Sequence, residues 1–297
     1  MKVCIDVTPI EKYLTGVGFY VLKLALTLQS LQISSSFQMG IAYQPRFFDW
    51  LRRRKYFPAP ISQHLNKFSS CEYVDIPVRI SNLFSKYSPD FLSYYLSHKD
   101  SPDILHGTNY SVWPWPNCRK VVSVYDLSFM RYPEYSNSVS RLYVEQIRRC
   151  LEYVDLILTI SHSTKQDIAH YLDISPDKIF VTPLASRYEC AEANNNPISS
   201  EDPELSILKK ISPKPYFLFT GTLEPRKNIP MLIRAFSALK SKYKVDHQLL
   251  LVGRKGWKYE PVFKAIEDSI CADEIHYLNY LSNQALMHLY QQAEAFI

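Results

Sequence analysis

Residues 215–239 read PYFLFTGTLEPRKNIPMLIRAFSAL, and this stretch predicts a strand, a positively charged loop and a helix, in that order. Residues 216–220 are bulky or β-branched, which is typical of a short buried strand, and the run ends at Gly221. Asn228 is suited to cap the following helix, and Pro230 falls in its first turn, where a missing N–H costs nothing. The apolar residues of this helix recur on one face: Leu232, Ile233, Phe236 and Leu239.

Two cations, Arg226 and Lys227, lie in the loop between this strand and this helix. Open α/β sheets bind anions at such a loop, where a parallel strand ends and a helix N-terminus begins. Two neighbouring positive charges at that place suit a phosphate or a diphosphate. For an Arg-Lys pair taken by itself, a solvated basic loop that only caps the helix is the alternative interpretation.

The run GTLEPRKN at residues 221–228 resembles the donor-binding loop of retaining glycosyltransferases with the GT-B fold, of the group 1 or family 4 type. The resemblance implies an α/β protein with two Rossmann-like lobes whose parallel sheets face a central cleft. It also implies that a sugar is moved from a UDP- or GDP-linked donor to a glycan or lipid-linked acceptor, in polysaccharide biosynthesis. The residues that the resemblance places on the donor diphosphate are Arg226, Lys227, Gly221 and Thr222.

The composition suits a two-lobed globular enzyme and is not that of a nucleic-acid-binding protein. Hydrophobic residues make up 46% of the 297 residues, enough for two cores. Charged residues make up 21%, and the net charge of +5 suits an anionic ligand or an anionic membrane surface. We predict an acceptor-side lobe over residues 1–186, a polar linker over 187–214 and a partial sugar-nucleotide-binding lobe over 215–297.

Glycine is scarce, and six of the seven glycines follow a predicted strand. A glycine at a strand exit lets a ligand approach the backbone closely. Gly16 and Gly18 follow the first predicted strand, where the resemblance implies a further contact with the donor diphosphate. A plain tight turn is the alternative for this GxG pair. A second exit that combines glycine with cations is predicted on the nucleotide side: Gly253, Arg254 and Lys255.

The six cysteines are scattered without a CxxC pair, so the sequence indicates neither a zinc site nor a disulfide framework. A reducing cytoplasm fits this usage. The chain starts directly with a predicted strand instead of a signal peptide, and no apolar run approaches the roughly 18 residues of a membrane span. We therefore expect a cytoplasmic protein, either in solution or peripheral at the inner face of the membrane.

One stretch, residues 44–61, interleaves cations with aromatic residues. Its cations are Arg52, Arg53, Arg54 and Lys55, and five aromatic residues flank them. Such a pattern can bind the interface of an anionic membrane. A solvated basic turn above packed aromatic rings is the alternative.

Two further strand exits carry candidate catalytic residues, His106 and Asp126. His106 ends a predicted strand, and either a structural hydrogen bond or a catalytic role fits that position. The family usually reads His-Asp-Leu where this chain reads Tyr125-Asp126-Leu127. A tyrosine can donate a hydrogen bond to a hydroxyl but carries no charge near neutral pH, so we transfer no proton-transfer role to Tyr125. Asp126 can orient a substrate hydroxyl or cap the next turn.

The rest of the chain predicts strands alternating with helices, with about seven strands in the first lobe. Ser163 and Gln166 are expected to form a capping box, while a weakly patterned region contains a predicted helix over residues 81–97. The predicted strands cover residues 2–8, 37–43, 73–76, 103–106, 120–125, 155–160, 179–182, 216–220, 247–252 and 275–278.

Family members continue beyond the point where this chain stops, at Ile297, with a loop and helix bearing two glutamates. From the resemblance we expect an incomplete second lobe and weak or absent turnover. No DxD motif occurs, so fixed cations and backbone N–H groups are expected to replace a metal ion at the diphosphate, with retention at the anomeric carbon. The alternatives are a non-catalytic or truncated nucleotide-sugar-binding protein and a GT-B-like epimerase.

Overall fold

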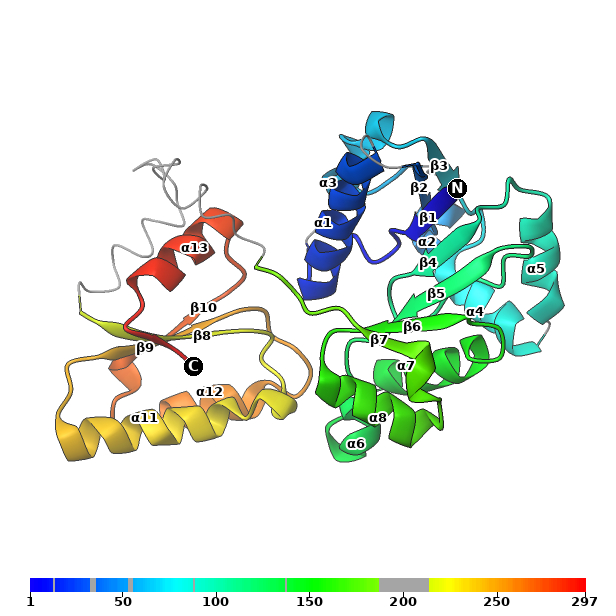
Figure 1. Cartoon of the computed structure of the whole chain (residues 1–297). Helices are drawn as coiled ribbons and strands as arrows, with labels where there is room; N and C mark the ends of the chain where they lie inside the picture. The colour runs from blue at the N-terminus through cyan, green and yellow to red at the C-terminus, as the bar shows by residue number, and fades with distance from the viewer. Residues whose placement is uncertain (13, 33–35, 53–55, 88, 137, 187–213) are drawn as a thin grey trace. The chain divides into compact units, whose positions relative to one another are not determined.

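The computed structural model describes all residues except 13, 33–35, 53–55, 88, 137 and 187–213. The chain divides into two compact units, Met1–Arg187 and Tyr188–Ile297. Each unit is a parallel sheet flanked by helices (Figure 1). The predicted linker lies outside the described residues except for Lys214, so the predicted boundaries of the lobes stay a prediction.

The first unit is built on a sheet of seven parallel strands, which is the predicted number, and their order is β3-β2-β1-β4-β5-β6-β7. The order reverses between β1 and β4, which is the place where open α/β sheets bind ligands. The strands are β1 Lys2–Asp6, β2 Gln38–Tyr43, β3 Ser70–Tyr73, β4 Ile104–Gly107, β5 Arg119–Ser123, β6 Leu156–Thr159 and β7 Ile179–Val181.

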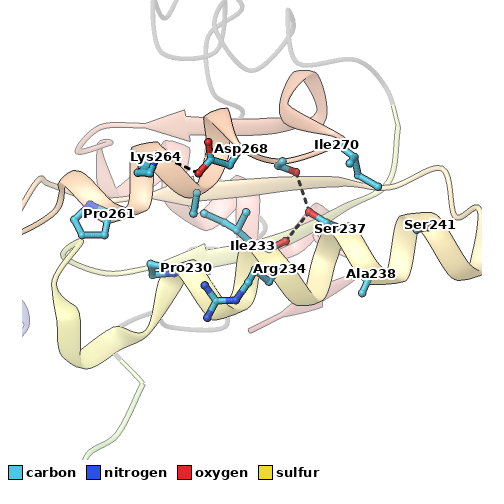
Figure 2. Close-up of a pocket in the computed structure, with 12 residues that line it drawn as sticks. Pro230, Ile233, Arg234, Ser237, Ala238, Ser241, Pro261, Lys264, Asp268 and Ile270 are labelled. Atoms are coloured by element: carbon cyan, nitrogen blue, oxygen red, sulfur yellow. Dashed lines mark hydrogen bonds and ion pairs between the residues drawn. The ribbon is translucent and has the colours of Figure 1, made fainter.

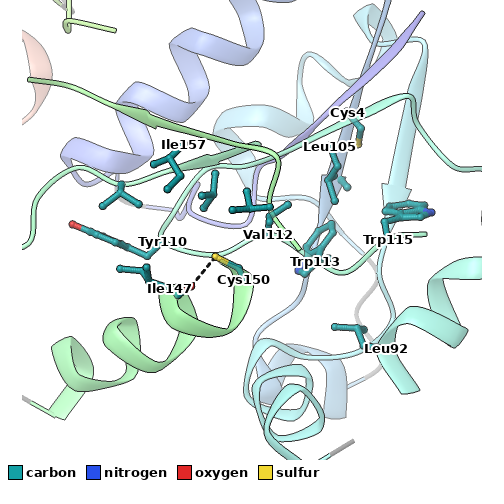
Figure 3. Packing of buried hydrophobic residues seen from close by; sticks show 14 of the residues in the cluster. Cys4, Leu92, Leu105, Tyr110, Val112, Trp113, Trp115, Ile147, Cys150 and Ile157 are labelled. Atoms are coloured by element: carbon teal, nitrogen blue, oxygen red, sulfur yellow. Dashed lines mark hydrogen bonds between the residues drawn. The ribbon is translucent and has the colours of Figure 1, made fainter. Parts of the chain in front are cut away.

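Helices cover both faces of this sheet and bury two separate cores. The described residues of the first unit form eight α-helices. They are α1 Gly16–Leu31, α2 Phe47–Leu51, α3 Ala59–Ser62, α4 Val78–Tyr87, α5 Pro89–Ser97, α6 Ser128–Arg131, α7 Ser138–Cys150 and α8 His162–Leu172. On one face Val21 of α1 packs with Ile5 of β1. On the other face, Ile147 of α7 and Leu105 of β4 belong to the larger cluster (Figure 3).

The second unit has a four-stranded parallel sheet in the order β10-β9-β8-β11. Helices α11 and α12 cover one face and α13 covers the other (Figure 1). Because successive strand residues point to opposite faces, Leu249 and Leu251 of β9 pack under α11 and α12, while Leu250 packs under α13. The elements are β8 Tyr216–Thr220, α11 Ile229–Tyr243, β9 Gln248–Val252, α12 Glu260–Glu267, β10 Ile275–Leu278, α13 Asn283–Gln292 and β11 Ala295–Phe296.

The structure corrects several local predictions. The predicted single helix over residues 81–97 is two helices, α4 and α5, because Pro89 lacks an N–H and starts a new helix. The predicted strand at 73–76 is wrong by a few residues, since β3 is Ser70–Tyr73. The basic turn expected near residue 50 contains the short helix α2, Phe47–Leu51.

One predicted helix cap is wrong and another is confirmed only in position. The cap of α8 is Ser161, whose Oγ accepts the Thr164 N–H at 3.1 Å, and not Ser163. Asn228 is the N-cap residue of α11, as predicted, but it has the left-handed conformation with φ 48° and its side chain makes no capping hydrogen bond. In both places the chain direction at the helix entry, which is set by tertiary packing, decides which side chain can reach the free N–H groups.

Candidate functional site

Two glycines shape the end of the second sheet, where β8 and β9 leave it. Gly221 and Gly253 have φ of 156° and 144°, values that side chains rarely adopt. A Cβ on Gly253 would lie 2.0 Å from the Gly221 carbonyl oxygen. The Gly221 N–H donates to the Val252 carbonyl at 2.9 Å, which holds the two turns together. The predicted positions of both glycines at strand exits are confirmed.

The two loops that follow, residues 221–227 and residues 253–258, continue to pair beyond the strands. The Leu223 N–H donates to the Arg254 carbonyl at 2.9 Å. In return, the Gly256 N–H donates to the Leu223 carbonyl at 3.0 Å. A side chain at residue 256 would collide with the same carbonyl, since its Cβ would lie at 2.7 Å. The cationic 221–227 loop is therefore held by a backbone ladder.

Arg226 and Lys227 differ in what they contact, although both are exposed. They lie on a short 3-10 turn, Pro225–Lys227, just before α11. The Arg226 Nη2 lies 2.8 Å from Glu224 Oε1 in an ion pair within the loop. Lys227 forms no ion pair with any residue that the structure describes. The structure thus leaves Lys227 available to an anion, whereas Arg226 is already engaged by a carboxylate.

The other predicted cations of the site, Arg254 and Lys255, lie against aromatic rings. The Lys255 Nζ is 4.4 Å from the ring centroid of Phe263, 4.9 Å from Tyr259 and 5.9 Å from Tyr277. The Arg254 guanidinium is 4.7 Å from the Tyr280 ring. Sequence reasoning missed these rings. The i, i+4 spacing of Tyr259 and Phe263 just behind the loop was the available signal.

In the first unit His106 is an interior residue of the sheet and not a group at its exit. It lies within β4 and is 7% exposed, with Nε2 2.8 Å from Ser123 Oγ of β5. Burial lowers the pKa of His106 to about 4, so the imidazole is neutral at pH 7.

Asp126 and Tyr125 follow β5, and both side chains have partners within the first unit. Asp126 Oδ1 accepts the Ser128 N–H at 3.0 Å and the Ser128 hydroxyl at 2.7 Å, which is the capping interaction weighed as the alternative. Tyr125 is buried and its hydroxyl donates to the Thr108 carbonyl. Burial also raises the pKa of Tyr125 well above its usual range. Both side chains therefore have structural roles in the absence of a ligand.

One carboxyl group at a strand exit was not found from the sequence. Asp6 ends β1 beside the position where the strand order reverses, and it is 8% exposed. Its Oδ1 accepts the Thr8 N–H at 2.8 Å. Burial raises the pKa of Asp6 to about 6. An acidic residue that closes an apolar strand was the signal in the sequence.

Gly16 and Gly18 form the first turn of α1 instead of a loop before it. Thr15 caps this helix, and its Oγ1 accepts the Gly18 N–H at 3.2 Å. A Cβ on Gly18 would lie 3.2 Å from the Pro9 carbonyl oxygen, whereas the space around Gly16 is open. Close packing against the Pro9 carbonyl explains why residue 18 is a glycine. The contact of Gly18 with a phosphate stays a prediction.

The basic aromatic stretch is described only in part, since Arg53, Arg54 and Lys55 lie outside the described residues. On α2, Phe48 is 64% exposed and Leu51 is 60% exposed, and Arg52 beside them is exposed. In the described part of the chain, no helix combines the length and apolarity needed to cross a bilayer.

A cavity of about 560 Å³ lies between α11 and α12, away from the paired loops (Figure 2). Its polar groups bond to one another, since the Ser237 hydroxyl lies 2.8 Å from Ser269 Oγ and donates to the Ile233 carbonyl at 2.9 Å. The cavity is lined by none of the residues predicted for the site. Among the described residues there is also no cluster of three or more His, Cys, Asp or Glu side chains that could hold a metal ion.

Two known family profiles match the chain, one in each unit. The profile described as "Glycosyltransferase Family 4" matches residues 16–185, and that described as "Glycosyl transferases group 1" matches residues 201–297. The O-antigen chain mannosyltransferase B of Escherichia coli is 30% identical over 198 residues, which are 65% of this chain and 50% of that protein. The chain therefore spans about half the length of this relative.

Solved structures share the architecture at low sequence identity. HepE of Anabaena, in complex with UDP and glucose, matches with a TM-score of 0.63 and 11% identity over 100% of this chain and 73% of its own. WaaG, a glycosyltransferase involved in lipopolysaccharide biosynthesis, matches with a TM-score of 0.60 and 12% identity over 100% of this chain and 74% of its own. At such identities the likeness shows the fold.

Proposed function

Because the chain belongs to glycosyltransferase family 4 and has the GT-B fold, we propose that it moves a sugar from a nucleotide-diphosphate donor to a glycan or lipid-linked acceptor. The Escherichia coli relative, an O-antigen mannosyltransferase, supports a role in polysaccharide biosynthesis. The neighbour with bound UDP and glucose supports a UDP-linked donor. A GDP-linked donor is the alternative to test.

The observation that carries this proposal is the exposed Lys227 ammonium at the exit of β8, which has no ion pair among the described residues. Negative charge develops on the departing diphosphate during glycosyl transfer, and a fixed cation stabilises it. The positive end of the α11 helix dipole lies directly after Lys227. Arg226 supplies a second, bidentate cation once the diphosphate replaces Glu224 as its partner.

This arrangement supports a metal-independent mechanism, and membership of the family supports retention at the anomeric carbon. The cations and the backbone N–H groups of the 221–227 loop take the place of a bound metal ion at the diphosphate. The acceptor hydroxyl then attacks from the face that the nucleotide leaves. In the first unit Asp126, which is half-buried at the exit of β5, is proposed to orient a hydroxyl. For His106, the buried hydrogen bond to Ser123 favours the structural role weighed from the sequence over a catalytic one, since both side chains are buried and the imidazole is neutral.

Calorimetry with UDP and with GDP tests the donor site. We expect one nucleotide to bind with micromolar affinity and Lys227→Ala to weaken that binding by at least about tenfold, as the loss of a charged hydrogen bond predicts. Lys242→Ala removes an exposed cation in the last turn of α11, outside both loops, as the matched control and should bind like the unmodified chain. Equal binding by Lys227→Ala and the unmodified chain would contradict the proposed site.

A non-catalytic nucleotide-sugar-binding protein is the second candidate, and the observation that favours it is Tyr125. Its hydroxyl is committed to the Thr108 carbonyl, and it stands where the family usually has a histidine. Transfer to a glycan acceptor decides between the two candidates. Nucleotide binding that depends on Lys227, with no sugar transfer, would identify the binding protein.

Peripheral membrane contact is part of the proposal and rests on the exposed Phe48 and Leu51 beside Arg52. Apolar side chains next to cations suit the interface of an anionic bilayer. Flotation with liposomes that contain phosphatidylserine tests this. We expect the chain to float at low salt and Phe48→Ser to reduce the floating fraction, while a chain that stays at the bottom at low salt would contradict membrane contact.

A further inference from the structure

Lys255 is exposed, and its ammonium lies over three aromatic rings that form an open cage on one side of it. Phe263 lies on α12, Tyr259 is the residue just before that helix, and Tyr277 lies on β10. The ring centroids lie 4.4, 4.9 and 5.9 Å from the Lys255 Nζ. A cation within about 6 Å of a ring face is attracted by the ring quadrupole, and here three rings act on one charge.

The rings also contact one another, so the cage is a built feature and not a set of separate encounters. Tyr259 and Phe263 meet edge to face with centroids 5.7 Å apart, and Phe263 meets Tyr277 in the same way at 5.1 Å. The Tyr277 hydroxyl donates to the Gly253 carbonyl at 3.0 Å. This hydrogen bond therefore links one ring of the cage to Gly253, the first residue of the loop that carries Lys255.

Lys255 also lies between the two backbone bonds that hold the cationic loop. The residue before it, Arg254, accepts the Leu223 N–H, and the residue after it, Gly256, donates to the Leu223 carbonyl. Leu223 itself is fully buried. Movement of the Lys255 backbone would thus shift Leu223, and with it the turn that carries Lys227 four residues later.

We propose that Lys255 is a positioning residue for the nucleotide site: caged by Tyr259, Phe263 and Tyr277, it fixes the 253–258 loop, which holds the 221–227 loop in its binding geometry. This inference rests on the proposed function of the 221–227 loop. It assigns Lys255 a role without contact with the nucleotide, in place of the direct contact predicted from the sequence.

The role depends on the positive charge and not on packing alone. Methionine is close to lysine in length and fills the cage with apolar atoms, but it lacks the charge that the ring faces attract. Arginine keeps the charge and stacks well on aromatic faces. The two replacements therefore separate the cation–π interaction from simple filling of space.

The test measures UDP and GDP binding by calorimetry in the 297-residue chain. We expect Lys255→Met to weaken the binding of the preferred nucleotide about fivefold and Lys255→Arg to keep it within about twofold, in line with the strength of cation–π contacts at exposed sites. Lys242→Met is the matched control, because its ammonium lies 4.9 Å from the centroid of the Tyr243 ring and residue 242 is in the last turn of α11, outside both loops. It should leave binding unchanged.

Two readouts distinguish positioning from a direct phosphate contact, and a third, chemical rescue, tests the cage itself. The dependence of nucleotide affinity on salt should be the same in Lys255→Met as in the unmodified chain, because no contact with the phosphate is lost. Amide hydrogen exchange at Leu223 and Gly256 should speed up in Lys255→Met without nucleotide. Propylammonium added to Lys255→Ala should partly restore nucleotide binding by entering the cage.

Three results would overturn this inference. The first is unchanged nucleotide binding by Lys255→Met. The second is an equal loss of nucleotide affinity in Lys255→Arg and Lys255→Met. The third is a nucleotide affinity that depends less on salt in Lys255→Met than in the unmodified chain. In each case a loss of binding in Lys227→Ala would leave the proposed function intact. An unmodified chain that binds neither nucleotide would instead refute the proposed function and this inference together.

Discussion

Gly253 packs so closely on Gly221 that a Cβ on Gly253 would lie 2.0 Å from the Gly221 carbonyl oxygen. Two loops that leave neighbouring strands therefore meet through bare backbone. This contact brings Leu223 into bonding distance of the loop that carries Lys255. The arrangement of the proposed donor site thus depends on residues that have no functional group of their own.

Gly253→Ala should destabilise the second unit by about 3 kcal/mol, because the new Cβ meets backbone and φ is 144°. Chemical denaturation, followed by the fluorescence of the four tryptophans, which lie in both units, measures this. Gly16→Ala is the matched control, since nothing lies within 4 Å of its Cβ and residue 16 begins a helix, where alanine is favoured. Equal effects of the two substitutions would contradict the close packing described here.

Glu224→Gln should tighten nucleotide binding by up to about fivefold, because it frees Arg226 from an exposed ion pair of modest strength. Calorimetry with UDP and GDP measures the change. Asp268→Asn removes a carboxylate from another exposed pair, with Lys264, and should have no effect. The gain should vanish when Glu224→Gln is combined with Arg226→Ala, and a gain that persists would show that Arg226 is not involved.

His106→Asn should make the first unit more resistant to acid. The pKa of His106 is about 4 in the folded chain, below the value of 6.5 for an exposed histidine, so the unfolded chain binds the proton first as pH falls. The resulting loss of stability starts below pH 6.5 and reaches about 3 kcal/mol near pH 4. Denaturation of both proteins at pH 7 and pH 4.5 measures this, and equal losses on acidification would count against the buried neutral imidazole.

Asp6→Asn should have the opposite dependence on pH. The pKa of Asp6 is about 6 in the folded chain, above the value of 3.8 for an exposed aspartate, so the buried carboxylate destabilises the fold above pH 6. At pH 7 the substitution should gain up to about 3 kcal/mol, and the gain should fade as pH drops towards 3.8. The same denaturation series measures it. A gain that is equal at pH 7 and pH 4.5 would contradict the raised pKa.

The order of strands and helices could be predicted from the sequence because hydrophobic periodicity is local. The strand predicted at residues 216–220 is β8, and the predicted count of seven strands in the first unit is confirmed. Helix caps were predicted less well, since Ser161 and Ser163 are equally suitable in sequence and the entry of the chain into α8 chooses between them. Helix α12, which supplies part of the aromatic cage, was missed.

The sequence by itself determined where the glycines and cations lie relative to the strand ends, because strand length and turn geometry are properties of neighbouring residues. The tertiary structure alone decided what each charged side chain does. Arg226 meets Glu224 and Lys255 meets three rings, while Lys227 meets no charged partner among the described residues. The physical reason is that burial, ion pairs and cation–π contacts depend on side chains that folding brings together from distant or differently oriented segments.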